Sequence, residues 1–204
     1  KNIYSIAIPS GVMTSLPSIL VALLNSLLAT VSQTAIAFFG IYFKLQSFIY
    51  MPANGLIQGM RPLISYNYGA RHFDRVKKII KVSIISTAVI LCCGTIIFMG
   101  LPELVLSWFN ATEQLLEIGI IGLRVISPCF ILSTMGVVIS GVFESLGKGR
   151  QSLTISLLRQ FIITLPLAYI LLKVIGLTFV IAEGIASVIA VILIKKELHN
   201  FKVD

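Results

Sequence analysis

The chain has 204 residues, of which 57% are hydrophobic and only 12% are charged, and its mean hydropathy is +0.99. This balance excludes an ordinary soluble domain and predicts a membrane protein with several spans. The net charge of +8 does not indicate a nucleic-acid partner, because the basic residues lie mostly at the ends of apolar runs. Lys and Arg are retained on the cytoplasmic side of a membrane, so we interpret the basic excess as a mark of topology.

The first third of the chain predicts two membrane spans and a surface helix. Residues 2–43 contain no charge, which is too long for one helix and fits a helix, a turn and the start of a second. We predict the first span at 6–29 and the second at 35–63. The following segment, 71–81, carries Arg71, Arg75 and Lys78 and predicts a short amphipathic helix on the cytoplasmic surface.

The remainder predicts four more spans, at 82–101, 118–142, 153–172 and 177–194. The loop at 102–117 has acidic residues, no Lys or Arg, and Trp108 as an interfacial anchor, which places it outside the cell. The turn at 144–151 and the tail from Lys195 are basic and therefore cytoplasmic. Residues 1–204 are thus expected to form an all-α bundle of six transmembrane helices with both ends in the cytoplasm.

The sequence contains no pattern of catalytic or metal-binding residues, and we expect neither an enzyme nor a cofactor. Cys92, Cys93 and Cys129 lie inside apolar runs and do not form a metal-ligand pattern with His72 or His199. We interpret them as reduced packing residues. The chain begins at Lys1 without a recognisable signal peptide, and we expect it to be part of a longer protein.

Leaving aside Arg61, at the inner boundary of the second span, four ionisable residues fall within the predicted spans: Lys44, Arg124, Arg159 and Glu183. A charge at the centre of a bilayer costs about 2.5 to 3.5 kcal/mol on insertion scales, so each needs a reason. The two arginines are more simply explained by side chains that reach the headgroups. Lys44 and Glu183 lie at comparable depths, roughly 14 and 9 Å below the outer face, so they either pair or contact cargo directly.

Uncharged polar residues in the same spans either line a wet cavity or form hydrogen bonds between helices. They are Asn25, Gln46, Gln58 and Gln160. Together with Lys44, Glu183 and Arg124, the residues Asn25, Gln46 and Gln160 are our candidates for the transport cavity. Internal prolines add candidate hinges at Pro17, Pro52, Pro62, Pro128 and Pro166.

Three motifs resemble the multidrug and toxin extrusion (MATE) transporters, specifically the second half of a bacterial member of the DinF/MepA-like branch. They are MPANGLIQGMRPLISYNYGA from Met51, LRVISPCF from Leu123, and ESLGKGRQSLTISLLRQ from Glu144. They occur in the family's order and at similar separations, and the resemblance covers nearly the whole chain.

The resemblance implies one six-helix lobe of a two-lobed transporter in the bacterial plasma membrane. In the family, an N-terminal six-helix lobe is the partner, and small organic cations or amphipathic drugs leave the cell in exchange for protons or sodium ions. A lipid-linked precursor flippase of the same superfamily is the alternative, since Lys44 and Arg124 suit phosphates. A nonfunctional or regulatory fragment is a third possibility.

The chain departs from one branch of the family in its acidic residues. Some members carry an acid in the first helix of this half and another in its fourth, whereas 15–18 and 126–136 contain none here. Around Glu183, Gly184 and Ser187 stand where we expect proline and an acid. Ion coupling is therefore expected to rest on Glu183 or, preferably, on the other lobe.

Overall fold

The computed structural model describes residues 4–29, 33–109, 111–158 and 175–200, and in these ranges the chain is helical with short turns. The prediction of an all-α fold is confirmed for this part of the chain. In chain order the helices are α1 (Tyr4–Leu28), α2 (Gln33–Gly69), α3 (Phe73–Gly100), α4 (Pro102–Ser107), α5 (Glu113–Ile126), α6 (Pro128–Ser145), α7 (Gly149–Leu157) and α9 (Ile175–Asn200).

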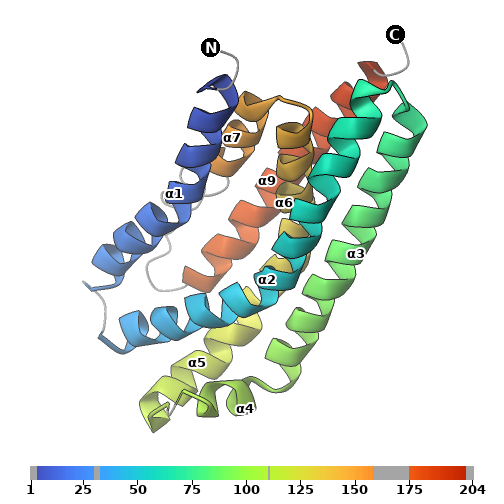
Figure 1. Ribbon diagram of the computed structural model, residues 1–204. Helices are drawn as coiled ribbons and strands as arrows, with labels where there is room; N and C mark the ends of the chain where they lie inside the picture. The colour runs from blue at the N-terminus through green and yellow to red at the C-terminus, as the bar shows by residue number, and fades with distance from the viewer. Residues whose placement is uncertain (1–3, 30–32, 110, 159–174, 201–204) are drawn as a thin grey trace.

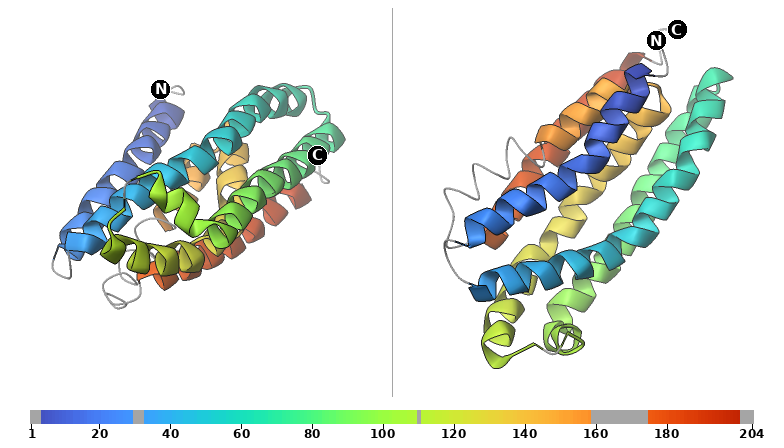
Figure 2. Two further views of the ribbon diagram at one scale, coloured as in Figure 1. Left: turned by 90° about the horizontal axis from the view of Figure 1, so that it is seen from below. Right: turned by 60° about the vertical axis from the view of Figure 1, so that its left-hand side comes forward.

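The long helices form an up-and-down bundle whose loops separate into two ends (Figure 1). The start of α1, the end of α9, and the α2–α3 and α6–α7 turns lie at one end, which we call the basic end. Helices α4 and α5 lie at the opposite end, as the second view from the side also shows (Figure 2). Helix α6 packs against α2, α3, α5, α7 and α9 and is the centre of the bundle.

Helix α2 is the longest helix and it bends. Its 37 residues include Pro52 and Pro62, and its direction changes part-way along (Figure 1). A proline inside a helix removes one backbone hydrogen bond and its ring clashes with a preceding carbonyl, which accounts for a bend. The candidate hinge Pro17 likewise lies within α1, whereas Pro166 falls outside the described residues.

The segment at 71–81 differs from the prediction. It is not a separate surface helix, because α3 runs without interruption from Phe73 to Gly100 and joins residues 73–81 of this segment to residues 82–100 of the next predicted span. The 28 residues extend about 42 Å, which exceeds the roughly 30 Å hydrocarbon core of a bilayer. A charged segment joined to an apolar one therefore continues as one straight helix, since no Pro or Gly interrupts the junction.

The predicted span at 118–142 is divided in the structure. Helix α5 ends at Ile126 and α6 begins at Pro128, with Ser127 between them. Pro128 lacks the N–H that would continue the hydrogen-bond ladder, and it occupies a position that starts a helix well. The candidate hinge Pro128 thus coincides with a break, and the short helix α4 occupies part of the predicted outer loop.

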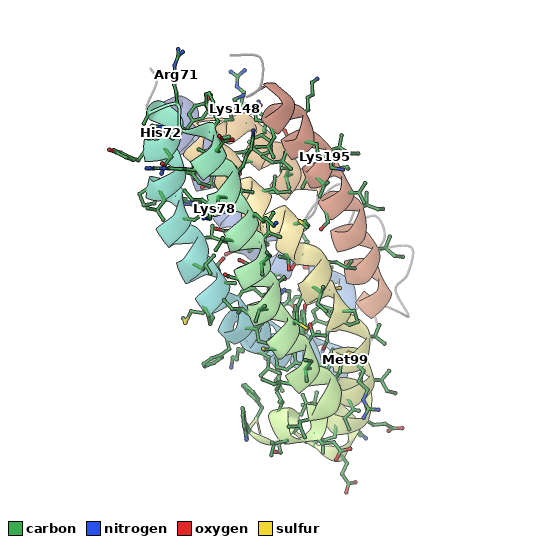
Figure 3. All side chains as sticks on the ribbon, turned by 90° about the vertical axis from the view of Figure 1, so that its right-hand side faces the viewer. Arg71, His72, Lys78, Met99, Lys148 and Lys195 are labelled. Atoms are coloured by element: carbon green, nitrogen blue, oxygen red, sulfur yellow. The ribbon has the colours of Figure 1, made fainter. Side chains whose placement is uncertain are left out.

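The two turns at the basic end close their helices in the same way. His72 N–H donates to Asn67 O at 2.8 Å, and Lys148 N–H donates to Phe143 O at 2.8 Å. In this Schellman arrangement the residue before the donor adopts a left-handed conformation. That residue is Gly147, with φ 72°, in one turn and Arg71, with φ 58°, in the other. The side chain of Arg71 extends away from the bundle (Figure 3).

The core divides into two apolar clusters along the bundle. One is built around Phe38, Tyr42 and Phe130, and the other around Ile64, Val142 and Phe143. By length and composition, two of the described helices, α3 and α6, are apolar enough to cross a membrane. The six predicted spans as a set stay a prediction.

Three glycines allow other helices to approach α2 closely. A Cβ added at Gly94 would lie 2.6 Å from Ile49 Cγ2, one at Gly122 2.4 Å from Phe38 Cζ, and one at Gly141 2.7 Å from Ile57 Cγ2. Small residues at helix contacts are the usual means of close packing in membranes. The backbones of α3, α5 and α6 therefore pack directly against side chains of α2 at these three glycines.

We expect Gly94→Ala to destabilise the protein by about 1 to 3 kcal/mol, because the new methyl group would overlap three carbons of Ile49. The matched control is Gly59→Ala on α2, where an added Cβ meets no described atom within 4 Å. The control should be neutral or slightly stabilising, since Ala favours a helix. The measurement is thermal unfolding in detergent, and equal melting temperatures for the two variants would contradict the packing argument.

Candidate functional site: a polar face on helix α2

One side of α2 is exposed and polar, although the helix has the length of a membrane span. Its exposed polar residues recur every three, four or seven positions and so share one face. We call this the polar face of α2, and it consists of Lys44, Ser47, Asn54, Gln58 and Ser65. The opposite side is buried and apolar, with Tyr42, Ala53 and Ile64 at 1%, 0% and 0% exposure.

Large apolar side chains lie on the same exposed side of α2, within the polar face or beside it. Phe48, Met51 and Tyr66 are 72%, 71% and 75% exposed. The accessible side of α2 thus combines a cation, amide and hydroxyl groups with two aromatic rings and a thioether. Such a mixture suits contact with molecules that are apolar but carry polar or charged groups.

Helices α3 and α9 present a different kind of surface. The exposed residues of α3 below its charged first turns include Val82, Ile85, Val89 and Ile96, and those of α9 include Ile185, Val188 and Ile192. Continuous aliphatic faces match hydrocarbon, whereas an amide or ammonium group in lipid is costly. The exposed faces of α3 and α9 are therefore suited to lipid, whereas the polar face of α2 is not.

Exposed hydroxyl groups on α1 and α2 are satisfied within their own helices. Ser15 donates to Gly11 O at 3.2 Å, Ser26 to Ala22 O at 3.0 Å, and Ser47 to Phe43 O at 2.8 Å. Bonds of this kind lower the cost of a hydroxyl in an apolar medium and bend helices slightly. The serines therefore do not by themselves require water, and the argument for a wet face depends on Lys44, Asn54 and Gln58.

The structure locates several of the predicted cavity residues. Lys44 is exposed on α2, Gln46 and Asn25 are half-buried on α2 and α1, and Arg124 is exposed on α5. Among the described side chains, Lys44 has no ion-pair partner.

The side chains of two further predicted cavity residues, Glu183 and Gln160, lie outside the structural description. Glu183 belongs to α9, but its side chain lies outside the description, so pairing with Lys44 stays a prediction. Gln160 also lies outside the described residues.

A partly buried ion pair at the basic end was not recognised from the sequence. Arg61 Nη2 lies 2.5 Å from Glu144 Oε2, and Arg61 Nη1 donates to Gln58 Oε1 at 3.1 Å. Ser152 Oγ lies 3.3 Å from the other oxygen of Glu144. The Glu144 side chain is only 14% exposed, against 35% for Arg61.

This pair belongs to a wider set of polar contacts, which we call the basic-end network. Ser152 donates to Ser140 O at 2.9 Å, and Ser65 donates to Ser145 O at 2.8 Å. Lys148 forms an ion pair with Glu197 of α9. The network thus connects α2, α6, α7 and α9 at the basic end, beside the apolar cluster that contains Leu146, Ile155 and Ile194.

Sequence reasoning assigned Arg61 to a span boundary and Glu144 to a turn. The available signal was that both lie at the cytoplasmic ends of predicted spans, inside motifs that carry the family resemblance. That signal does not identify partners, because 83 positions separate the two residues in the chain and only packing brings α2 beside α6.

The described side chains give no support for metal chemistry. Among them no three His, Cys, Asp or Glu residues gather in a way that holds a metal ion. The chemistry present is recognition by polar, aromatic and cationic groups on α2, anchored at one end by the basic-end network.

A bundle with lipid-type faces on two helices and a polar face on a third has the form of one half of a membrane transporter. The family model described as MatE matches residues 9–170, so the chain belongs to the MatE family of transporters and not to a family of enzymes. The predicted family is confirmed.

Curated relatives give the same result over the full chain. "Multidrug export protein MepA" of Staphylococcus haemolyticus (strain JCSC1435) is 30% identical over 210 residues, covering 100% of this chain and 46% of the relative. The protein of the same name from Staphylococcus aureus (strain MSSA476) is also 30% identical, over 209 residues with the same coverage. The chain therefore spans about half the length of these relatives.

Solved structures confirm the fold. A structure described as the outward-facing conformation of a multidrug resistance MATE family transporter matches with a TM-score of 0.93 at 19% identity, covering 99% of this chain and 47% of that one. A superfamily transporter from Pyrococcus furiosus, described as having reverse polarity of its binding pocket, matches with a TM-score of 0.90 at 20% identity, covering 98% of this chain and 47% of that one. The all-helical chain corresponds to about half of each transporter.

We expect Arg61 and Glu144 to be energetically coupled. Replacing one partner leaves the other charge partly buried without its counterion, whereas replacing both removes that penalty. A double-mutant cycle with Arg61→Gln and Glu144→Gln should give a coupling free energy of about 1 to 3 kcal/mol, measured by unfolding of the full-length protein in detergent.

The comparison pair is Asp74 and Lys77, which lie 4.0 Å apart with the Asp74 side chain fully exposed. The same cycle there should show no measurable coupling, because solvent screens such pairs. Strictly additive effects of the Arg61 and Glu144 substitutions would show that the contact does not stabilise the bundle.

Proposed function

We propose that the protein exports cationic or amphipathic drugs and toxic compounds by alternating access, and that this chain supplies one six-helix lobe. The observation that carries the proposal is the polar face of α2. Lys44, Asn54 and Gln58 are exposed on a helix whose neighbours α3 and α6 are long and apolar enough to cross a membrane. Exposed groups of this kind at membrane depth need water, cargo or another protein surface beside them.

The second lobe is the expected partner of this face. The relatives are about twice as long as this chain, and a transporter cavity lies between two such halves. The exposed rings of Phe48 and Tyr66 and the thioether of Met51 supply apolar contact, and the amides supply polar contact. The staphylococcal relatives, which are multidrug export proteins by name, agree with this combination.

The coupling ion in this proposal is H⁺ or Na⁺, and its carboxylate ligands come from elsewhere. The polar face of α2 contains no Asp or Glu. Glu144 is engaged by Arg61 at the basic end and is a poor ion ligand there. Coupling therefore rests on Glu183 or, preferably, on acidic residues of the other lobe.

We infer the orientation of the bundle in the membrane from the positions of its basic residues. Apart from Lys44 and Arg124, the described Lys and Arg residues lie at the basic end, and Lys78, Lys148 and Lys195 appear in that part of the bundle, far from Met99 (Figure 3). We place this end, and with it both ends of the chain, in the cytoplasm of a bacterium. Glu103, Glu113 and Glu117 then lie near the outer surface.

A second candidate function follows from the sign of charge on the polar face. Its charged member is a lysine, Lys44, with no acidic residue beside it in the face. An ammonium group repels a cationic drug and attracts a phosphate, which favours a flippase for lipid-linked precursors. The superfamily transporter from Pyrococcus furiosus, described as having a binding pocket of reverse polarity that suggests a different function, supports this alternative.

Accessibility of the polar face to water is the first test. In a full-length variant without native cysteines, Ser47→Cys and Asn54→Cys should react with a membrane-impermeant maleimide. Val89→Cys, equally exposed on α3 but facing lipid in our proposal, should not react. Reactivity is measured by gel shift in intact membranes, and equal labelling at all three positions would contradict the assignment of faces.

Transport by the full-length protein in proteoliposomes is the second test. A cationic dye should move under an imposed proton or sodium gradient, and Lys44→Gln should lower KM for that dye severalfold, because it removes a like charge. Lys196→Gln, which removes one charge outside the polar face, should leave KM unchanged. Dye that neither gradient moves would exclude the exporter, and loss of precursor flipping on Lys44→Gln would establish the alternative.

A further inference from the structure

Helix α3 carries a charged segment and an apolar segment on one and the same face. Arg75, Lys78 and Lys81 are exposed in its first three turns. Val82, Ile85 and Val89 follow below them and are 53%, 54% and 57% exposed. At 100° per residue these six positions fall within about 60° of one line along the helix. The face therefore has a cationic upper part and an aliphatic lower part.

The length of α3 places the change from charged to apolar at a membrane boundary. Its 28 residues extend about 42 Å, roughly 12 Å more than a hydrocarbon core. The excess corresponds to about eight residues, which are the charged turns beginning at Phe73. The lysines thus reach headgroup depth while the aliphatic residues lie at acyl-chain depth.

The charges of this face are not neutralised by the protein. The acidic residue nearest in sequence, Asp74, is fully exposed and lies 4.0 Å from Lys77. Glu144 and Glu197 at the same end pair with Arg61 and Lys148. Among the described side chains, Arg75, Lys78 and Lys81 have no acidic partner within ion-pair distance.

Helix α9 repeats the arrangement on the other side of α6. Lys195 and Lys196 are exposed at its basic end, and Ile185, Val188 and Ile192 are 44%, 60% and 60% exposed below them. Helices α3 and α9 both pack on α6, and Lys78 and Lys195 appear at the same end of the bundle (Figure 3). Helices α3 and α9, which both pack on α6, therefore both carry exposed lysines at the basic end and exposed aliphatic residues below them.

We propose that the α3 face binds an acidic phospholipid of the inner leaflet, with its phosphate at Lys78 and Lys81 and its acyl chain along Val82, Ile85 and Val89. A zwitterionic lipid fits the apolar part equally well, but its choline or ethanolamine group offsets the phosphate charge near the lysines. The inference does not depend on which cargo the protein transports. The face on α9 is expected to bind the same class of lipid.

Lipid binding by the full-length protein in detergent tests the proposal. Native mass spectrometry with added phosphatidylglycerol or phosphatidylcholine gives the apparent Kd for the first lipids bound. The double variant Lys78→Gln/Lys81→Gln should weaken phosphatidylglycerol binding by about tenfold at low ionic strength, since each basic residue near an anionic surface contributes. Its phosphatidylcholine binding should not change, and Lys78→Arg/Lys81→Arg should restore phosphatidylglycerol binding.

The matched control is Arg71→Gln/Arg150→Gln, which removes the same charge at the same end without touching the α3 face. It should change phosphatidylglycerol binding by less than twofold. An equal loss in the control, equal binding of the two lipids by the unaltered protein, or displacement of the lipid by millimolar inorganic phosphate would each overturn the proposal. So would a dimer that buries the α3 face and excludes lipid.

Discussion

The absence of water in a bilayer is the constraint on which this structure depends. A helix satisfies the hydrogen-bonding groups of its own backbone, so the remaining requirement is that each side chain faces surroundings of matching polarity. Aliphatic residues on α3 and α9 are suited to lipid, and α6 is enclosed by other helices. The polar face of α2 satisfies neither condition and needs a wet or protein surface, which is why α2 is the centre of the functional argument.

Helix α2 combines close packing on its buried side with internal prolines that bend it. Gly94, Gly122 and Gly141 let three helices approach α2 at backbone distance, so the buried side of α2 is fixed along most of its length. Pro52 and Pro62 introduce weak points in the same helix. A helix that is bent yet tightly held on one side can present a curved surface without losing its contacts, as a cavity-lining helix requires.

The basic-end network has a different role from the core. At the basic end, ion pairs with limited exposure lie beside the apolar cluster around Ile64 and Phe143. Arg61 with Glu144 joins α2 to α6, and Lys148 with Glu197 joins the α6–α7 turn to α9. A buried pair adds little net stability against an apolar alternative, but it specifies which helix ends meet. Such specificity keeps the ends of α2, α6 and α9 in register.

The sequence by itself determined the class of protein, the helical fold, the separation of basic and acidic ends, and the family. These depend on composition, on runs of apolar residues, and on motifs, all of which are local. The sequence also identified Lys44 as a charge that needs a reason and Pro128 as a place where a helix changes. It did not predict that residues 71–81 would continue into α3, because amphipathic turns on a surface and at the end of a span have the same local pattern.

Only the tertiary structure decided which faces are open and which distant residues meet. The exposure of Lys44 and Asn54, the burial of Tyr42 on the same helix, and the contact of Arg61 with Glu144 depend on how α2 rotates against α6. Local sequence does not fix that rotation, since it results from Gly94, Gly122 and Gly141 admitting side chains of α2 that lie 45 to 84 positions away. Chain-distant packing, and not residue type, therefore defines the site.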